Sequence, residues 1–458
     1  MQNPAQTHGP TRPPPLAGVR VVDLGQVYSV PFVGAMLADL GAEVIKIEGP
    51  DRMDVTRMNG VYAEAELGPD CWNRISMYNV VNRGKKSLVL DLGKDEGRSI
   101  LRDLIAKSDV LMENFTPRVM KNWKMDWATL SREQPGLIMV SNTGYGSGTG
   151  PYAEYPAQAT SQEATHGLAH VTGYKGGLPS KAGASYIDFL AASSCLSGIA
   201  LALRHKRRTG SGQWIEVGMY QIGCFTVGEY ILDWLSNGRI GERIGDRHPW
   251  LAPQGCYPCA GDDAWCVLSV RSDEEWLSLC RVLGDDALAA DPALRAAAGR
   301  MERHDAIDKW IAGWTRSRSA QDVALALQQA GLPAAQVKDA RDLHFDPHLR
   351  ARGFLERVSY PPERGMGERV IMGRPWRYCG TPLRIPRPAP AFGEHNREVL
   401  QAVLGYDNVR CDDLASRGII AGRPTTVQPA AHAERSIPEM VGLGLFKAYD
   451  GGYQESAP

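Results

Sequence analysis

The sequence has no excess of charge of one sign. Its 51 lysine and arginine residues are matched by 52 aspartate and glutamate residues, and the formal net charge is −1. A chain without an overall basic field has no general electrostatic attraction for nucleic acid or for an anionic membrane. We therefore expect neither nucleic acid nor a membrane among its partners.

Long hydrophobic runs are also missing. The longest apolar stretch, residues 189–203, contains three serines and is shorter than the roughly 20 residues that span a bilayer. Residues 1–15 lack the charged head and apolar centre of a signal peptide, and we expect a disordered arm there. These features favour a cytoplasmic protein in which the apolar stretch forms a buried helix.

Cysteines are few, and their spacing shows no regular pattern of pairs. There are nine, an odd number scattered over 458 residues, which does not indicate a disulfide framework. The one close pair, Cys256 and Cys259, has no second pair or histidine pattern nearby, so it is weak evidence for a metal or redox site. We expect reduced thiols.

The fingerprint of a dinucleotide site is absent. Residues 18–24, 29–42 and 43–50 have the spacing of a strand, a helix and a second strand, and Glu48 lies where an acid would bind ribose. The connecting turn, DLGQVYSVP, has a single glycine in place of G-x-G-x-x-G. We expect no nicotinamide and no flavin.

Other catalytic signatures are missing too. No Gly-x-Ser-x-Gly and no His-Glu-x-x-His occurs, and His166 and His170 lack a third ligand, so we expect no metal. The glycine-rich segment TGYGSGTGP, residues 143–151, does not continue as a P-loop. It is typical of a flexible loop, and such loops often line active sites in α/β folds.

What the sequence does contain is an alternation of strand and helix patterns, which predicts the α/β class with a parallel sheet. From about 228 to 345 the pattern changes to amphipathic helices around one strand, 263–271, which indicates a smaller domain. We predict a disordered arm (1–15), a large domain (16–228), a small domain (229–345), a return to the large domain (346–421) and a polar extension (422–458).

One acidic residue, Asp188, stands at the start of the small and apolar run ASYIDFLAASSCLSGIALALRHKRRTGSGQ. A carboxylate that enters an apolar run must be hydrogen-bonded, paired or used, because an unsatisfied buried charge is costly. From these residues alone, a helix N-terminal cap and a functional carboxylate are equally consistent with the pattern.

Three cationic residues and an asparagine stand at the start of the strand pattern at 86–92. They are Asn82, Arg83, Lys85 and Lys86. Such groups can contact a phosphorylated ligand. A solvated charge cluster fits the spacing equally well.

Several long blocks together resemble class III CoA-transferases, which include the formyl-CoA and carnitine CoA-transferases and have the α-methylacyl-CoA racemases as relatives. The resemblance covers about 16–418. Its carriers are LAGVRVVDLGQVYSVPFVGAMLADLGAEVIKIE, NRGKKSLVLDL, SDVLMENFTP, GLIMVSNTGYGSGTGPY, the segment GASYIDFLAASSCLSGIALALRHKRRTGSGQWIEVGM and DPHLRARGF.

The resemblance implies an enzyme in which Asp188, spaced ahead of TGSGQ, is the nucleophile. Its carboxylate would attack a donor acyl-CoA, pass through an aspartyl anhydride and an aspartyl-CoA thioester, and deliver CoA to an acceptor carboxylic acid. Coenzyme A would enter as substrate, with no metal or redox cofactor. The resemblance further implies site residues at Gly144, Tyr145 and Gly146, and CoA contacts from Arg83, Lys85, Asn114, Phe115 and Tyr28.

Two departures from the family pattern bear on function. The racemases carry a His-Asp pair where this chain has Gln158 and Ala159, so proton abstraction beside the thioester loses its acid and base. Many transferases also keep an acid at the Ala159 position, and Glu163, one helical turn on, is a candidate substitute.

The second departure concerns aromatic residues. The tetraglycine loop of formyl-CoA transferases is replaced by RHPWLAPQGCYP with Trp250 and Tyr257, and Tyr28 and Val30 replace small or polar residues. We interpret these as a site for a bulky, partly apolar acceptor, such as an aryl-dicarboxylic acid, with succinyl-CoA as donor.

The resemblance also implies a Rossmann-like large domain built from both chain ends, a smaller α/β domain, and an interlocked dimer, either a homodimer or a heterodimer with a related subunit. Two alternatives stay open. One is an α-methylacyl-CoA racemase or isomerase, and the other is a non-catalytic CoA-binding subunit of a heteromeric transferase.

Overall fold

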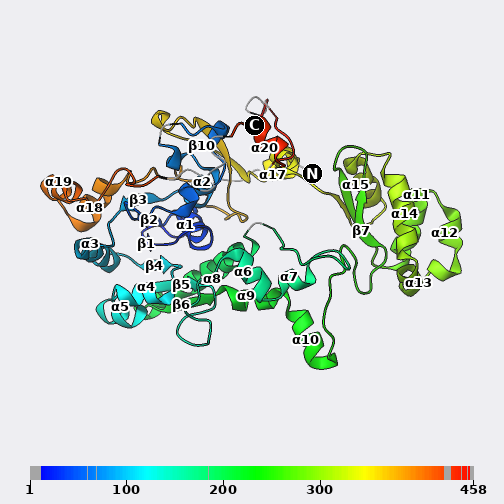
Figure 1. Ribbon diagram of the computed structural model, residues 1–458, viewed down its shortest axis with the longest axis horizontal. Coiled ribbons are helices and arrows are strands. Elements are labelled where there is room, and N and C mark those ends of the chain that lie inside the picture. The colour runs from blue at the N-terminus through cyan, green and yellow to red at the C-terminus, as the bar shows by residue number, and fades with distance from the viewer. Residues whose placement is uncertain are drawn as a thin grey trace. The chain divides into compact units, whose positions relative to one another are not determined.

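The computed structural model describes residues 12–58, 60–68, 70–183, 185–427, 435–444, 446–450 and 452–453. Most of the expected arm (1–15) and part of the expected extension (422–458) lie outside these residues. The chain divides into two compact units, one made of residues up to 166, 183–227 and 350 onward, the other of 167–182 and 228–349 (Figure 1).

The first unit contains a sheet of six strands in the order β3-β2-β1-β4-β5-β6, all parallel. The predicted α/β class with a parallel sheet is confirmed. The strands are β1 (Arg20–Asp23), β2 (Glu43–Glu48), β3 (Lys86–Val89), β4 (Val110–Glu113), β5 (Ile138–Thr143) and β6 (Trp214–Gly218).

The strand order changes direction between β1 and β4. Strand β1 pairs with β2 on one side and with β4 on the other, so the loops that follow β1 and β4 leave the sheet next to each other. In open parallel sheets, ligands bind at such a switch point, outside the carboxyl ends of the strands. The fold alone therefore directs attention to the loops that follow Asp23 and Glu113.

Helices cover both faces of this sheet, because alternate strand residues point to opposite sides. On one face Val21, Val44 and Val140 pack with α1 (Ser29–Asp39) and α8 (Tyr186–Thr209). On the other face Val22, Ile45 and Met139 pack with a second set of helices. These are α3 (Asp95–Ala106), α4 (Pro117–Asn122), α5 (Trp127–Glu133), α18 (Asn396–Leu404) and α19 (Asn408–Ser416).

Helix α8 corresponds to the long apolar run. A Cβ on Gly198 would lie 2.9 Å from Cγ2 of Ile215, so glycine allows α8 to pack closely on β6. Cys195 and Ile199 are buried against the sheet, whereas Leu201 is exposed. Within the described residues, α8 is the one helix whose length and composition would suffice to cross a membrane, a test that core helices also pass.

The last part of the chain completes the first unit at the β3 edge. Helix α18 packs beside β3, the Val89 N–H donates to Oδ1 of Asn396 over 2.8 Å, and the Ser87 N–H donates to Nδ1 of His395 over 3.2 Å (Figure 1). Also in this unit are β10 (Leu355–Ser359), β11 (Glu368–Met372), α2 (Ser76–Val81), α6 (Ala159–Thr165), α9 (Met219–Thr226), α20 (Ile437–Gly442), and the 3-10 turns η1 (Val55–Arg57), η2 (Ala63–Ala65), η3 (Cys71–Asn73) and η5 (Pro362–Arg364).

The second unit has its own core around a three-stranded antiparallel sheet, β7-β8-β9. Strand β8 is the one expected at 263–271. The strands are β7 (Gln254–Pro258), β8 (Trp265–Ser269) and β9 (Ala334–Gln336), with α7 (Leu168–Val171), α10 (Gly228–Asn237), α11 (Asp273–Leu283), α12 (Asp286–Ala290), η4 (Pro292–Leu294), α13 (Ala297–Glu302), α14 (His304–Thr315), α15 (Ala320–Gln329) and α16 (Ala340–Phe345). Helix α17 (Pro347–Ala351) spans the boundary.

All nine cysteines are free thiols, and Cys259 is buried in the core of the second unit. Among the residues that the structure describes, no group of three or more histidine, cysteine or acidic side chains is arranged to hold a metal ion.

Candidate active site

The loop that follows β1 is held at its backbone from several sides. We call residues 24–28 the β1–α1 loop. Oδ1 of Asp23 accepts the N–H of Gly25 over 2.8 Å. Asn114, which follows β4, accepts the N–H of Gln26 over 2.8 Å and donates to its carbonyl over 2.9 Å. Asn114 thus ties together the two loops at the switch point of the sheet.

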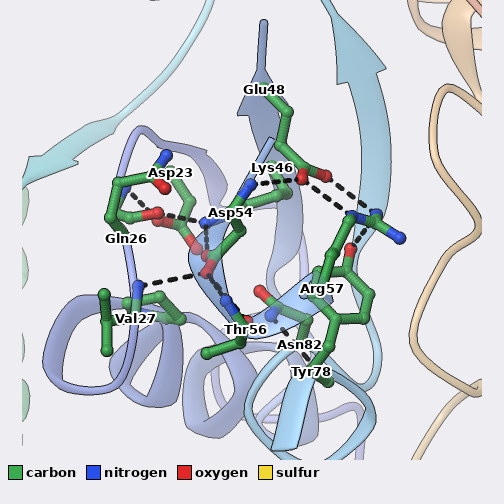
Figure 2. Close-up of polar contacts among 12 residues, drawn as sticks. Asp23, Gln26, Val27, Lys46, Glu48, Asp54, Thr56, Arg57, Tyr78 and Asn82 are labelled. Carbon is green, nitrogen blue, oxygen red and sulfur yellow. Dashed lines mark hydrogen bonds and ion pairs between the residues drawn. The ribbon is translucent and has the colours of Figure 1, made fainter. Parts of the chain in front are cut away.

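A buried ion pair also contacts this loop (Figure 2). Nζ of Lys46, on β2, lies 2.7 Å from Oδ2 of Asp54 and also donates to the carbonyl of Gly25. Oδ1 of Asp54 accepts the N–H of Val27 over 3.2 Å. Both charged side chains are fully buried. A second buried pair, Arg57 with Glu48 at 2.8 Å, lies beside the first.

Asp188 lies where two helices begin. It is in the first turn of α8, and its own backbone N–H and that of Ser29, the first residue of α1, favour the charged form of its carboxylate. Helix N-termini carry partial positive charge and stabilise a carboxylate. Burial opposes this effect and raises the pKa of Asp188 to about 6. Within the described residues, its Oδ2 is buried without a hydrogen-bond partner.

Two neighbours of Asp188 share its electrostatic environment. Burial, together with the charges of Asp188 and Asp54, raises the pKa of the half-buried Tyr28. The charge of Glu163, buried on α6, raises the pKa of Asp188. The structure therefore brings Tyr28 and the expected substitute acid Glu163 into the surroundings of Asp188.

Helix α6 contributes one residue that the sequence did not single out. Gln162 is fully buried, and its side-chain amide has no hydrogen-bond partner in the described part of the chain. Nε2 of Gln162 lies 3.1 Å from where a Cβ on Gly144 would be, so α6 packs against the loop that follows β5. Nothing in the local sequence distinguishes this glutamine from an exposed one.

The positions that would carry the acid and base of a racemase have a structural role. Gln158 is the N-cap residue of α6, its N–H donates to Oγ of Ser161 over 3.1 Å, and Ala159 is the first residue of that helix. His166 is a core histidine: burial lowers its pKa, and a Cβ on Gly223 would lie 2.1 Å from its ring.

The glycine loop after β5 lies close to α6 and α9. Gly146 has a φ of +92°, and its N–H donates to Oγ1 of Thr143 over 3.1 Å, so that N–H is already engaged. The ring of Tyr145 packs against Tyr152, Tyr155 and Tyr220, with centroids 5.6, 6.4 and 5.7 Å away.

Two residues expected to contact CoA are instead paired inside the protein. The Arg83 guanidinium lies 2.9 Å from Oδ2 of Asp39, and the Lys85 ammonium lies 2.7 Å from Oδ2 of Asp23, with all four side chains buried. Burial lowers the pKa of Lys85 to about 8. Their role in CoA binding stays a prediction, and this packing argues against it.

The other expected residues have mixed environments. Phe115 packs edge to face on Trp123, with centroids 5.6 Å apart, and contacts the core. Trp250 is 66 % exposed. The expectation of aromatic surface from Tyr257 is wrong, because this side chain is buried in the core of the second unit and its hydroxyl donates to Asp308 over 2.9 Å.

Comparison with known proteins places this geometry in a family. The model of CoA-transferase family III matches residues 16–396. The chain is 34% identical to succinyl-CoA–D-citramalate CoA-transferase of Chloroflexus aurantiacus over 405 residues, 88% of this chain and 97% of the relative. It is also 34% identical to succinate–glutarate CoA-transferase of Agrobacterium fabrum over 397 residues, 86% of this chain and 97% of that one.

The solved structures agree. A CAIB/BAIF family protein from Brucella suis superposes with a TM-score of 0.76 at 28% identity, covering 86% of this chain and all of that one. The chain therefore belongs to CoA-transferase family III, and it is an enzyme that acts as a CoA-transferase.

Proposed function

We propose that this enzyme transfers CoA from succinyl-CoA to a carboxylic acid, with Asp188 as the covalent nucleophile. One observation carries the proposal: the buried Asp188 carboxylate lies at the beginning of two helices and has an oxygen with no hydrogen-bond partner in the described residues. Backbone N–H groups near the carboxylate are typical of a structural cap, but a cap alone does not account for a buried Oδ2 that bonds no group in the described residues. A pKa of about 6 leaves the group mostly ionised at neutral pH, as a nucleophile requires.

The reaction follows from carboxylate chemistry. The Asp188 carboxylate attacks the thioester carbonyl, the C–S bond breaks, and CoA leaves as thiolate from an aspartyl–succinyl anhydride. The thiolate then attacks the aspartyl carbonyl, forming aspartyl-CoA and releasing succinate. The acceptor carboxylate attacks aspartyl-CoA and expels the thiolate, which returns to the acceptor's acyl carbon and frees Asp188. One thioester replaces another, so no net redox change occurs.

The choice of substrates rests on the relatives and on Tyr28. The two relatives named above act on citramalate and glutarate with succinyl-CoA or succinate, which supports a dicarboxylic acid as acceptor. The half-buried ring of Tyr28 near Asp188 is an apolar aromatic surface, and it supports an aryl-dicarboxylic acid as the acceptor. Tyr257 no longer supports a bulky aromatic acceptor, since it is buried elsewhere.

The remaining contacts are proposals as well. Asn114, Phe115 and Tyr28 are the proposed CoA contacts, because they lie on or next to the loops at the switch point. The loop 144–146 is the proposed oxyanion contact, and its contribution comes from groups other than the engaged N–H of Gly146.

We also propose two domains, the larger Rossmann-like, and an interlocked dimer with an identical or related subunit. On α10, Leu232, Trp234 and Leu235 are 63, 57 and 68 % exposed. Apolar side chains gathered on one helix support its burial by a partner. We propose a cytoplasmic enzyme that needs no metal, nicotinamide or flavin.

The test is intact-mass analysis after incubation with succinyl-CoA and other acyl-CoAs. We expect a CoA-sized covalent adduct on the wild type and none on Asp188→Ala or Asp188→Asn. The control variant is Asp346→Asn, which neutralises a buried carboxylate in the second unit, whereas Asp188 lies in the first. This variant should still form the adduct. Binding of CoA without any adduct would overturn the nucleophile and favour the non-catalytic subunit, and deuterium exchange at the α-carbon without acceptor would favour the racemase.

A further inference from the structure

We infer that the buried Lys46–Asp54 ion pair positions the nucleophile: it holds the β1–α1 loop so that the first N–H of α1 meets the carboxylate of Asp188. This inference rests on the proposed role of Asp188. Lys46 and Asp54 act through the loop, so they are positioning residues rather than catalytic ones. Figure 2 shows the pair and the loop backbone that it contacts.

The two side chains hold consecutive parts of the loop. Lys46 donates to the carbonyl of Gly25, and Asp54 accepts the N–H of Val27 over 3.2 Å. The residue after Val27 is Tyr28, and the next is Ser29, whose N–H reaches Asp188. A displacement of the peptide at Val27 is therefore passed to Ser29 over two residues of chain.

The loop needs this support because its backbone is strained. Val27 has a φ of +66°, in the left-handed region that a β-branched residue rarely adopts. Such a conformation is energetically unfavourable and persists only where the surroundings impose it. If the contacts from Lys46 and Asp54 were lost, Val27 would relax toward negative φ, and the start of α1 would move.

The pair is poorly explained as a device for stability alone. Desolvation can cancel the attraction within a buried ion pair, and apolar replacements are often as stable. Here both carboxylate oxygens of Asp54 have specific partners. Oδ2 accepts from Lys46, and Oδ1 accepts from the N–H of Val27 and from the N–H and hydroxyl of Thr56. Burial alone would raise the pKa of Asp54, but Lys46 and Thr56 more than offset it and lower the pKa.

A matched pair of variants separates positioning from stability. Asp54→Asn and Glu48→Gln each neutralise a fully buried carboxylate in an ion pair of 2.7 or 2.8 Å. Asp54 contacts the β1–α1 loop, whereas Glu48 contacts Arg57 and the N–H of Asp54. A glutamine at 48 keeps an oxygen for that N–H, so the loop contacts remain.

The experiment measures the single-turnover rate of CoA adduct formation with succinyl-CoA between pH 5 and pH 8. For Asp54→Asn we expect a loss of about 100-fold, the effect of a misplacement on the order of 1 Å. We also expect the midpoint of the rate to move to higher pH, because the carboxylate loses the N–H of Ser29. Glu48→Gln should keep the wild-type midpoint. An unchanged midpoint in Asp54→Asn, or an equal shift in both variants, would overturn the inference.

A second variant tests the inference even if Asp54→Asn does not fold. The double variant Lys46→Met with Asp54→Asn leaves no unpaired buried charge, so it should fold even if Asp54→Asn does not. Titration of Asp188 by carboxyl ¹³C NMR, with the signal assigned by its loss in Asp188→Asn, should give a higher pKa in the double variant than in the wild type. An equal pKa would overturn the inference. This readout needs no turnover, so a wild type that forms no adduct would count against the proposed function only.

Discussion

The backbone N–H of Ser29, which opens α1, stabilises the charged carboxylate of Asp188, which lies in the first turn of α8. Two helices that are distant in sequence thereby meet at one carboxylate. Their N-termini favour its ionised form, and burial favours its neutral form. The pKa of about 6 shows that burial is the larger effect, and this balance has measurable consequences.

The first consequence is the pH dependence of the chemical step. Only ionised Asp188 attacks a thioester, so the rate of adduct formation should rise with pH and level off above about pH 6, the pKa of this group. Quenched-flow mass spectrometry across pH 4.5–8 measures this rate. A rate that is flat across this range would show that another step or another group controls the reaction.

The second consequence concerns stability. Asp188 has a higher pKa in the folded protein than in the unfolded chain, so its ionisation costs folding free energy as pH rises from about 4 to 6. Asp188→Asn removes this cost. We expect the variant to unfold with a free energy higher by up to about 3 kcal/mol at pH 8, and no higher at pH 3.5.

Urea denaturation at the two pH values measures this difference. A variant that is less stable than the wild type at pH 8 would mean that the carboxylate is well paired in the folded protein. The same variant should form no adduct, so stability and activity would change in opposite directions.

Arg83 tests the assignment of CoA contacts. In the structure its guanidinium pairs with Asp39, and both side chains are buried. Arg83→Met should therefore lower the free energy of unfolding by about 3 kcal/mol, since it leaves a buried carboxylate without its main partner. The Kd for CoA, measured by calorimetry on folded protein, should stay within twofold. A tenfold weaker Kd with unchanged stability would restore Arg83 as a CoA contact.

Gly34 tests the packing of α1 above the buried Lys85–Asp23 pair. A Cβ at this position would lie 2.7 Å from Oδ2 of Asp23 and 2.8 Å from Cε of Lys85. Gly34→Ala should destabilise the protein by about 1–3 kcal/mol. Gly313→Ala, in α14 with open space around it, should stabilise the protein by about 0.5–1 kcal/mol. Thermal unfolding compares them, and equal shifts would contradict the contact.

The sequence indicated part of this site, but it could not show how the buried charges around it are paired. Asp188 and the strands that lead to the switch point have local signatures, namely an acid at the start of an apolar run and the periodicity of strands. The cations at 83 and 85 look like a solvated or ligand-binding cluster, because their partners, Asp39 and Asp23, are far away in the chain. Only the folded structure shows that each charge is already matched.

The same limit applies to the Lys46–Asp54 pair. Lys46 occupies an ordinary strand position, and Asp54 lies in a turn eight residues later. Neither residue is unusual by type or spacing. Their importance comes from contacts with the backbone of Gly25 and Val27, and no pattern of residue types encodes such contacts.

The return of the chain to the β3 edge sets an order for biogenesis. On the ribosome, strands β1 to β6 emerge before α18, yet the N–H groups of Ser87 and Val89 find His395 and Asn396 only after residues 228–349 have been synthesised. Until then the nascent first unit keeps an open edge and an uncovered apolar face. Translation must therefore pass through residues 228–349 before the first unit can close, and its apolar surface stays accessible to chaperones during that interval.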